Sequence, residues 1–222
     1  MQFSDSFDRA DGADLGAEWT PYTGRELKIF SNAVRATTLD NTADEFCTLQ
    51  GPGPDQYAQV SLKTLTEATG EISVGVRATA AAGTRTKYFV VAHQTGTRLG
   101  KLIAGAFTEF TTDATVWASS DILRLTVNQR GNDALLTVYR NGIALFSYLD
   151  APAAIASGTL SLSIYALTSL ANVEADDFLG GDFIEVRSEA HPNLKVLLAD
   201  IEDDGRFDDL DVRNWFCRML PA

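Results

Sequence analysis

The chain has 222 residues, of which 45% are hydrophobic and 22% are charged. This composition excludes collagen, a disordered tail, a small disulfide-rich protein and a membrane-spanning chain. Thirty acidic residues outnumber 18 basic ones, so the formal net charge is −12. Such an acidic chain repels phosphate backbones, and we therefore expect a cation rather than nucleic acid as a partner. No uncharged stretch has the pattern of a membrane helix, so we expect no membrane insertion.

The first residues of the chain contain neither the basic nor the apolar region of a secretory signal. Its two cysteines, Cys47 and Cys217, are 170 positions apart and form no CxxC motif. Two cysteines in a chain of this length favour reduced, buried thiols, and a single long-range bridge is the alternative.

Apolar and polar residues alternate through most of the chain up to residue 183. The alternation is clearest in segments 57–65, 71–78, 121–129, 134–140 and 158–165. Because successive side chains on a strand point to opposite faces, each segment predicts a strand with one apolar and one polar face. Glycine- and asparagine-containing turns separate the segments, and Asn141-Gly142 is the clearest hairpin signal. The pattern predicts an all-β fold, either a two-sheet antiparallel sandwich or a barrel.

The pattern changes after residue 183, where we place a domain boundary. Residues 1–183 form the predicted β domain, and residues 184–222 form a short C-terminal loop-helix tail. We expect irregular chain over 184–195, followed by a short apolar run and an acidic loop. Four apolar residues beyond this loop recur at the spacing of one helical face: Val212, Trp215, Phe216 and Met219.

Two segments at the ends of the β domain resemble a known family. The opening segment Phe3–Trp19 resembles the D-x-F-x-R-x-D-G-x-L-G-x-x-W start of laminin-G-like, concanavalin-type jelly-roll domains. The segment Val173–Phe178 resembles their D-D-F ending. The resemblance implies a jelly-roll sandwich whose first and last strands lie side by side. Such domains occur in bacteriophage tail and head-decoration proteins and in extracellular bacterial carbohydrate-active enzymes, where many are structural or bind glycans.

The tail contains a loop that fits the twelve-residue EF-hand pattern and resembles a dockerin half-repeat. The predicted ligands of a structural Ca²⁺ are Asp200, Glu202, Asp204, the carbonyl group of Arg206, Asp208 and Asp211. Gly205 occupies the turn position, but Glu202 is longer than the usual Asp or Asn, and Asp211 reaches less far than the usual Glu. The alternatives are a β-turn with a solvated acidic rim and a site for another cation. A second acidic group would form if the terminal strands meet: Asp5, Asp8, Asp11, Asp14, Asp176 and Asp177.

Catalytic patterns are weak in this sequence, and we expect no enzymatic activity. The two histidines, His93 and His191, belong to no hydrolase or metalloprotease motif. Glu174-Ala-Asp176 has the first spacing of the glucanase pattern E-x-D-x-x-E, but Leu179 occupies the last position. For glycan binding, Trp117 in a polar loop is the aromatic residue we most expect to be exposed, and Tyr88 is a second candidate. Core packing is the alternative for each aromatic residue.

These observations predict a non-enzymatic structural or adhesion module of a viral particle, as in a bacteriophage tail or head-decoration protein. Its expected location is the virion, and its expected partners are other virion proteins, a second copy of the chain or a host surface glycan. The apolar face of the terminal helix would dock on the sandwich or on a neighbouring subunit. The alternative is a carbohydrate-binding module of a secreted bacterial protein, and a glycoside hydrolase is the third choice.

Overall fold

The computed structural model describes residues 2–22, 26–47, 53–81, 84–182, 185–187 and 195–197. The chain divides into two compact units, residues 1–183 and residues 184–222. The predicted calcium loop (200–211) and the terminal helix (212–219) lie outside the described residues, so both stay predictions. No helix in the described part of the chain has the length and apolar character needed to cross a membrane.

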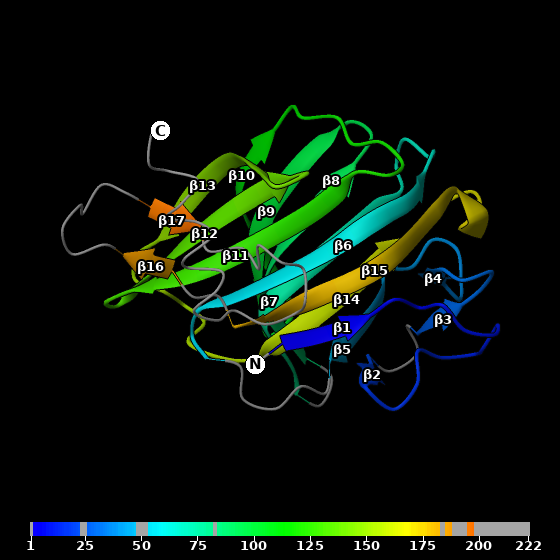
Figure 1. Cartoon of the computed structure of the whole chain (residues 1–222), viewed down its shortest axis with the longest axis horizontal. Coiled ribbons are helices and arrows are strands. Elements are labelled where there is room, and N and C mark those ends of the chain that lie inside the picture. The colour runs from blue at the N-terminus through cyan, green and yellow to red at the C-terminus, as the bar shows by residue number, and fades with distance from the viewer. Residues whose placement is uncertain are drawn as a thin grey trace, which may run out of the picture. The chain divides into compact units, whose positions relative to one another are not determined.

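The first unit is a sandwich of two antiparallel sheets (Figure 1). The eight-stranded sheet contains β1 (Gln2–Asp5), β3 (Leu27–Ile29), β4 (Val34–Ala36), β6 (Gln56–Leu65), β11 (Ile122–Arg130), β12 (Asp133–Arg140), β13 (Ile143–Asp150) and β15 (Val173–Asp182). The seven-stranded sheet contains β2 (Trp19–Pro21), β5 (Ala43–Cys47), β7 (Glu71–Ala81), β8 (Thr84–His93), β9 (Gly96–Ile103), β10 (Ala106–Asp113) and β14 (Thr159–Tyr165). A short 3₁₀ helix, η1 (Leu170–Asn172), precedes β15. The all-β prediction is confirmed, and the arrangement is the sandwich rather than the barrel.

The strand order of each sheet shows how distant segments become neighbours. One sheet runs β13-β12-β11-β6-β15-β4-β3, with β1 also paired to β15. The other runs β10-β9-β8-β7-β14-β5-β2. In Figure 1 the first sheet lies in front of the second, and β6 and β15 cross its middle.

The hydrophobic core lies between the two sheets, and the predicted alternation explains it. Ile72, Val74 and Val76 on β7 are fully buried, whereas the residues between them face the other side of the sheet. Strand β6 contributes Ala58, Val60 and Leu62 from the opposite sheet in the same way. Each of the larger side chains contributes about 1.5–3 kcal/mol on burial, so the alternating segments hold the two sheets together.

The opening and closing segments of the domain meet, as the resemblance implied. Strand β1 pairs antiparallel with β15, with Phe3 opposite Gly180. The carboxylate of Asp5 accepts hydrogen bonds from the Arg9 guanidinium (2.6 and 3.1 Å) and from Trp19 Nε1 (2.9 Å). The Trp19 ring packs edge-on against Phe178, with centroids 5.0 Å apart. The residues of the opening motif therefore hold the two ends of the domain together.

The predicted hairpin at Asn141-Gly142 is confirmed. These two residues connect β12 and β13 and have φ angles of 52° and 79°. Both angles lie in the left-handed region, which Asn and Gly adopt at low cost.

The second unit contains a small antiparallel sheet that the sequence pattern did not predict. Strands β16 (Glu185–Arg187) and β17 (Lys195–Leu197) pair with Val186 opposite Val196. The expectation of irregular chain over 184–195 is therefore wrong for β16 and for Lys195, the first residue of β17. A β-branched residue at the centre of each favours extended backbone, but three-residue strands are too short to show alternation.

Candidate functional site

The two aromatic residues predicted to bind a ligand are buried. Trp117 is 1% exposed, and its Nε1 donates a hydrogen bond to Thr97 Oγ1 (2.6 Å). Tyr88 is fully buried in the core, where its hydroxyl donates to Asp150 Oδ2 (2.6 Å). The predicted exposure of Trp117 is wrong because the indole has an internal partner for its N–H group and can enter the core despite its polar loop.

Several of the acidic residues at the ends of the domain have structural partners. Asp11 accepts a hydrogen bond from the Ser31 amide (2.7 Å), and Asp14 accepts one from the Gly16 amide (2.9 Å). On β15, Asp176 lies 3.3 Å from Lys63 Nζ, and Glu174 accepts from Thr64 Oγ1 (3.2 Å). Burial, Asp176 and Asp8 raise the pKa of the nearby Asp177. Among the described residues, no group of three or more Asp, Glu, His or Cys side chains could hold a metal ion.

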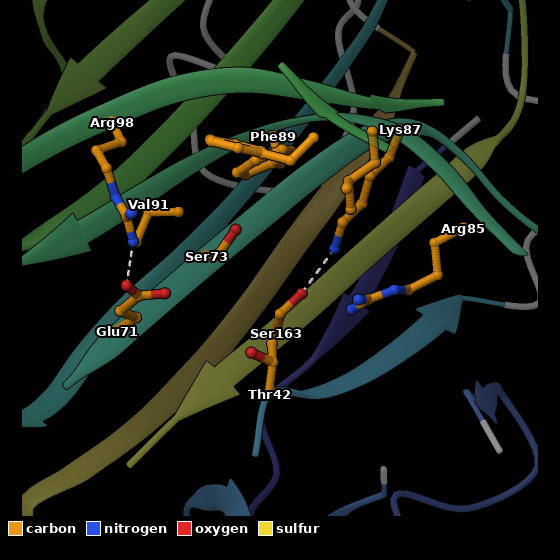
Figure 2. Close-up of a pocket in the computed structure, with 11 residues that line it drawn as sticks. Thr42, Glu71, Ser73, Arg85, Lys87, Phe89, Val91, Arg98 and Ser163 are labelled. Carbon is orange, nitrogen blue, oxygen red and sulfur yellow. Dashed lines mark hydrogen bonds and ion pairs between the residues drawn. The ribbon is translucent and has the colours of Figure 1, made fainter. Parts of the chain in front are cut away.

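The outer face of the seven-stranded sheet carries a pocket of about 200 Å³ (Figure 2). Its lining comes from five adjacent strands and from the residue before β5. The described lining residues are Thr42, Glu71, Ser73, Arg85, Lys87, Phe89, Val91, Arg98, Leu102, Phe107 and Ser163. Trp117 and Tyr88, the two aromatic residues singled out from the sequence, are not among the described lining residues.

Small residues at the centre of the outer face make room for the pocket. A Cβ atom on Gly75 would lie 2.4 Å from Ser161 Oγ and 3.0 Å from Lys87 Cδ. A Cβ atom on Gly100 would lie 2.6 Å from the carbonyl oxygen of Thr108 and 3.3 Å from the Phe107 ring. Gly75 therefore leaves room for the Lys87 side chain to cross β7, and Gly100 lets the Phe107 ring approach the sheet closely.

A buried ion pair forms one end of the pocket. Lys87 Nζ lies 3.0 Å from both carboxylate oxygens of Asp44 and 2.7 Å from Ser163 Oγ. The Lys87 and Asp44 side chains are 3% and 0% exposed. Burial lowers the pKa of Lys87, whereas the Asp44 carboxylate favours its charged form. Arg85 contacts the same carboxylate at 3.1 Å. These interactions hold the ammonium group in place.

A second ion pair, between Arg98 and Glu71, forms the other end. Figure 2 shows these two side chains facing each other, with Ser73 between them and Lys87. The Arg98 and Glu71 side chains are 35% and 27% exposed, far more than Lys87. Burial raises the pKa of Glu71, and the Arg98 guanidinium opposes that rise. Among the described charged lining residues, this pair is the most exposed to solvent.

Ser73 is a polar lining residue whose hydroxyl is buried. It is 5% exposed, and its Oγ has no hydrogen-bond partner among the described residues. A buried polar group without a partner costs about 1–3 kcal/mol, so such a group in a pocket indicates a place for a ligand oxygen or a water molecule.

Apolar side chains form the remaining wall. Phe89, Val91 and Leu102 make a small cluster separate from the core between the sheets. The Phe107 ring lies 5.7 Å from the Phe89 ring, measured between centroids, and is 52% exposed. Phe107 therefore presents an aromatic surface beside the charged and hydroxyl groups of the pocket.

This site is hidden in the sequence because residues 88–92 form an apolar run, in which outward-facing Phe89 and Val91 look like core residues. A weaker signal was present in the alternation of β7 and β14. Their outer positions hold Ser73, Gly75, Ser161 and Ser163, whose small size leaves space on that face.

Comparison with known proteins supports the fold. No protein-family model matches the sequence, and no curated protein matches it. The solved structure of carbohydrate-binding module CBM66 from Bacillus subtilis has a TM-score of 0.53 and 13% identity, covering 74% of this chain and 94% of its own. A prokaryotic β-1,3-1,4-glucanase (lichenase) derived from a mouse hindgut metagenome has a TM-score of 0.54 and 12% identity, covering 82% and 99%. A Bacillus subtilis protein of unknown function with a galectin-like fold has a TM-score of 0.54 and 11% identity, covering 74% and 89%. The chain thus has the jelly-roll, galectin-like sandwich fold.

Proposed function

We propose that this chain is a carbohydrate-binding module and that its ligand occupies the pocket on the outer face of the seven-stranded sheet. The observation that carries the proposal is that one pocket is lined both by the exposed ring of Phe107 and by a buried hydroxyl, Ser73, that has no partner among the described residues. Binding pockets combine apolar and aromatic walls with a few placed polar groups. A sugar ring matches this combination because its C–H face packs on an aromatic ring while its hydroxyls exchange hydrogen bonds.

The fold neighbours support this proposal over a role in a virion. They include a carbohydrate-binding module and a lichenase, so the fold occurs in proteins that act on or bind carbohydrates. A secreted location accords with such a role. The virion location and virion partners stay predictions.

We further propose that the pocket binds without hydrolysing. Glycosidases generally place two carboxyl groups about 5–9.5 Å apart around the scissile bond. Glu71 is the one carboxylate among the described lining residues, and Arg98 engages it. The pair on β15, Glu174 and Asp176, belongs to the other sheet and contacts Thr64 and Lys63.

A glycan array followed by titration calorimetry tests the binding function. The wild type should bind at least one glycan, and Phe107→Ala should weaken that binding about tenfold through loss of the aromatic surface. Ile143→Ala, at an apolar residue 71% exposed on the other sheet, is the matched control and should leave affinity unchanged. Absence of binding to every glycan, or equal affinity in both variants, would contradict the proposal.

A further inference from the structure

We propose that the pocket selects sugars that carry an anionic substituent, a carboxylate or a sulfate, and that Arg98 is its principal contact. This inference rests on the proposed function and specifies its ligand class. Three observations support this inference: the charges of the lining, the exposure of Arg98 and the position of Ser73.

The pocket is positive within an acidic chain. Its described lining includes Arg85, Lys87 and Arg98 but one carboxylate, Glu71. The Asp44 carboxylate behind the lining offsets one further cation, which leaves an excess of one positive charge. The chain as a whole has a net charge of −12. A local positive charge attracts an anionic group even though the chain as a whole is negative.

Of the three cations, Arg98 is the one placed to contact a ligand. Lys87 is 3% exposed and already faces Asp44 and two serine hydroxyls, and Arg85 is 17% exposed against the same carboxylate. Arg98 is 35% exposed and has Glu71 as its ion-pair partner. A guanidinium has five donors in a planar fork, so it can bind a second oxyanion while it keeps the first.

Ser73 lies in the same row of the sheet as Arg98. Ser73 is opposite Val91 on the next strand, and Val91 is opposite Arg98 on the strand after that. In Figure 2 the Arg98 side chain lies beside Val91 and points toward Glu71, on the Ser73 side of the pocket. An acidic sugar with its charged group at Arg98 would place neighbouring oxygens near the Ser73 hydroxyl, which has no partner in the described part of the chain. An anionic group would accept hydrogen bonds from the Arg98 guanidinium. A neutral sugar would leave these donors without a charged acceptor.

The test uses the full chain on an array of neutral, uronate-, sialate- and sulfate-bearing glycans. We expect the bound glycans to be anionic. Calorimetry with the best of them and with its carboxyl-reduced or desulfated counterpart should show at least a tenfold loss of affinity when the charge is removed. Whether reduction or desulfation causes the loss distinguishes a carboxylate from a sulfate as the anion.

Variants then assign the effect to the pocket. Arg98→Gln should weaken binding of the anionic glycan about 10- to 100-fold, as expected for a lost charge-assisted hydrogen bond. Glu71→Gln should strengthen binding of the anionic glycan because the competing carboxylate is gone.

Lys63→Gln is the matched control: Lys63 is also 35% exposed and also pairs with a carboxylate, but on the other sheet. It should leave affinity unchanged. If Arg98→Gln does not fold, Arg98→Lys, which keeps the charge and loses the planar fork, should give an intermediate loss.

The outcomes separate this inference from the proposed function. Binding of neutral glycans alone, weakened by Phe107→Ala, would overturn the anionic selectivity and keep the carbohydrate-binding function. Equal losses in Arg98→Gln and Lys63→Gln would show diffuse charge attraction and would overturn the role of Arg98. Binding of no glycan at all would overturn both proposals.

Discussion

Lys87 on β8 and Asp44 on β5 form an ion pair across two intervening strands, with Nζ 3.0 Å from both carboxylate oxygens. The lysine side chain crosses β7 above Gly75 and contacts Ser161 and Ser163 on β14. This contact joins four neighbouring strands on their outer face. It fixes one end of the proposed binding pocket while leaving the Arg98 end accessible.

Removing one partner of this ion pair should strongly destabilise the fold. Lys87→Met removes the ammonium group that neutralises the Asp44 carboxylate. That carboxylate is 0% exposed, so water cannot replace the lost interaction. We expect a loss of about 3–5 kcal/mol in the free energy of unfolding. Urea denaturation of the variant measures this change.

The double variant Lys87→Met/Asp44→Leu is the control for that loss. It removes both charges, so it should be less destabilised than Lys87→Met alone. Equal or greater destabilisation of the double variant would show that the lost energy does not come from an uncompensated carboxylate.

Gly75 should tolerate no side chain. Gly75→Ala would place its Cβ 2.4 Å from Ser161 Oγ, so the serine and Lys87 would have to move. We expect a loss of about 1–3 kcal/mol in the free energy of unfolding, together with weaker glycan binding. Gly12→Ala is the matched control because its Cβ would meet nothing closer than 3.5 Å. A Gly75→Ala variant as stable as Gly12→Ala would refute the proposed passage of Lys87 across β7.

Glu45 should make stability depend on pH near neutrality. It is 1% exposed, and burial raises its pKa to about 7, although the Leu27 amide donates to its carboxylate. The raised pKa contributes stability that is fully present below the unfolded value of 4.5 and is lost as pH rises through 7. Above pH 7 the folded protein holds a desolvated negative charge.

Glu45→Gln removes that ionisation and keeps an oxygen that can accept from Leu27. As the pH rises from 4.5 to 7, the variant should therefore gain stability relative to the wild type. The total gain should be about 3 kcal/mol, because the pKa of Glu45 is raised from 4.5 to about 7. Urea denaturation of both proteins from pH 4 to pH 9 measures the difference. Parallel stability curves across this range would contradict the assignment.

Trp117 should act in stability and not in recognition. Because the ring is 1% exposed and its N–H group donates to Thr97, Trp117→Ala should cost about 3–5 kcal/mol of unfolding free energy. Glycan affinity of the folded variant should stay within about twofold of the wild type, because the indole packs in the core and is not among the described residues that line the pocket. Thermal denaturation and calorimetry below the melting transition give the two quantities. Lost affinity with unchanged stability would restore Trp117 as a ligand contact.

The fold could be predicted from the sequence because its determinants are local. The alternation Ile72, Val74, Val76 orients β7 without knowledge of its neighbours, and Asn141-Gly142 fixes a hairpin by its backbone preferences alone. The pairing of the terminal strands was predicted by family resemblance. The structure adds a physical cause, since the Trp19 ring, held by Asp5, packs on Phe178 of the closing strand.

The candidate site could not be predicted in the same way because it depends on contacts across strands. Lys87 and Asp44 are far apart in the sequence and meet through the order of four strands. Phe89 and Val91 alternate with core residues that are equally apolar, so composition does not reveal which of them face outward. The prediction that Trp117 is exposed was wrong for a different reason. The residue lies in a polar segment, but its one polar side-chain atom, Nε1, donates to Thr97, so the ring can be buried.

An NMR titration of the isotope-labelled chain with the best-binding glycan tests the central claim most directly. We predict that amide shifts change with the ligand at Ser73, Phe89, Arg98 and Phe107, on the outer face of the seven-stranded sheet. The amides of β11–β13 in the other sheet should remain unperturbed. Saturable changes confined to the eight-stranded sheet would contradict the account.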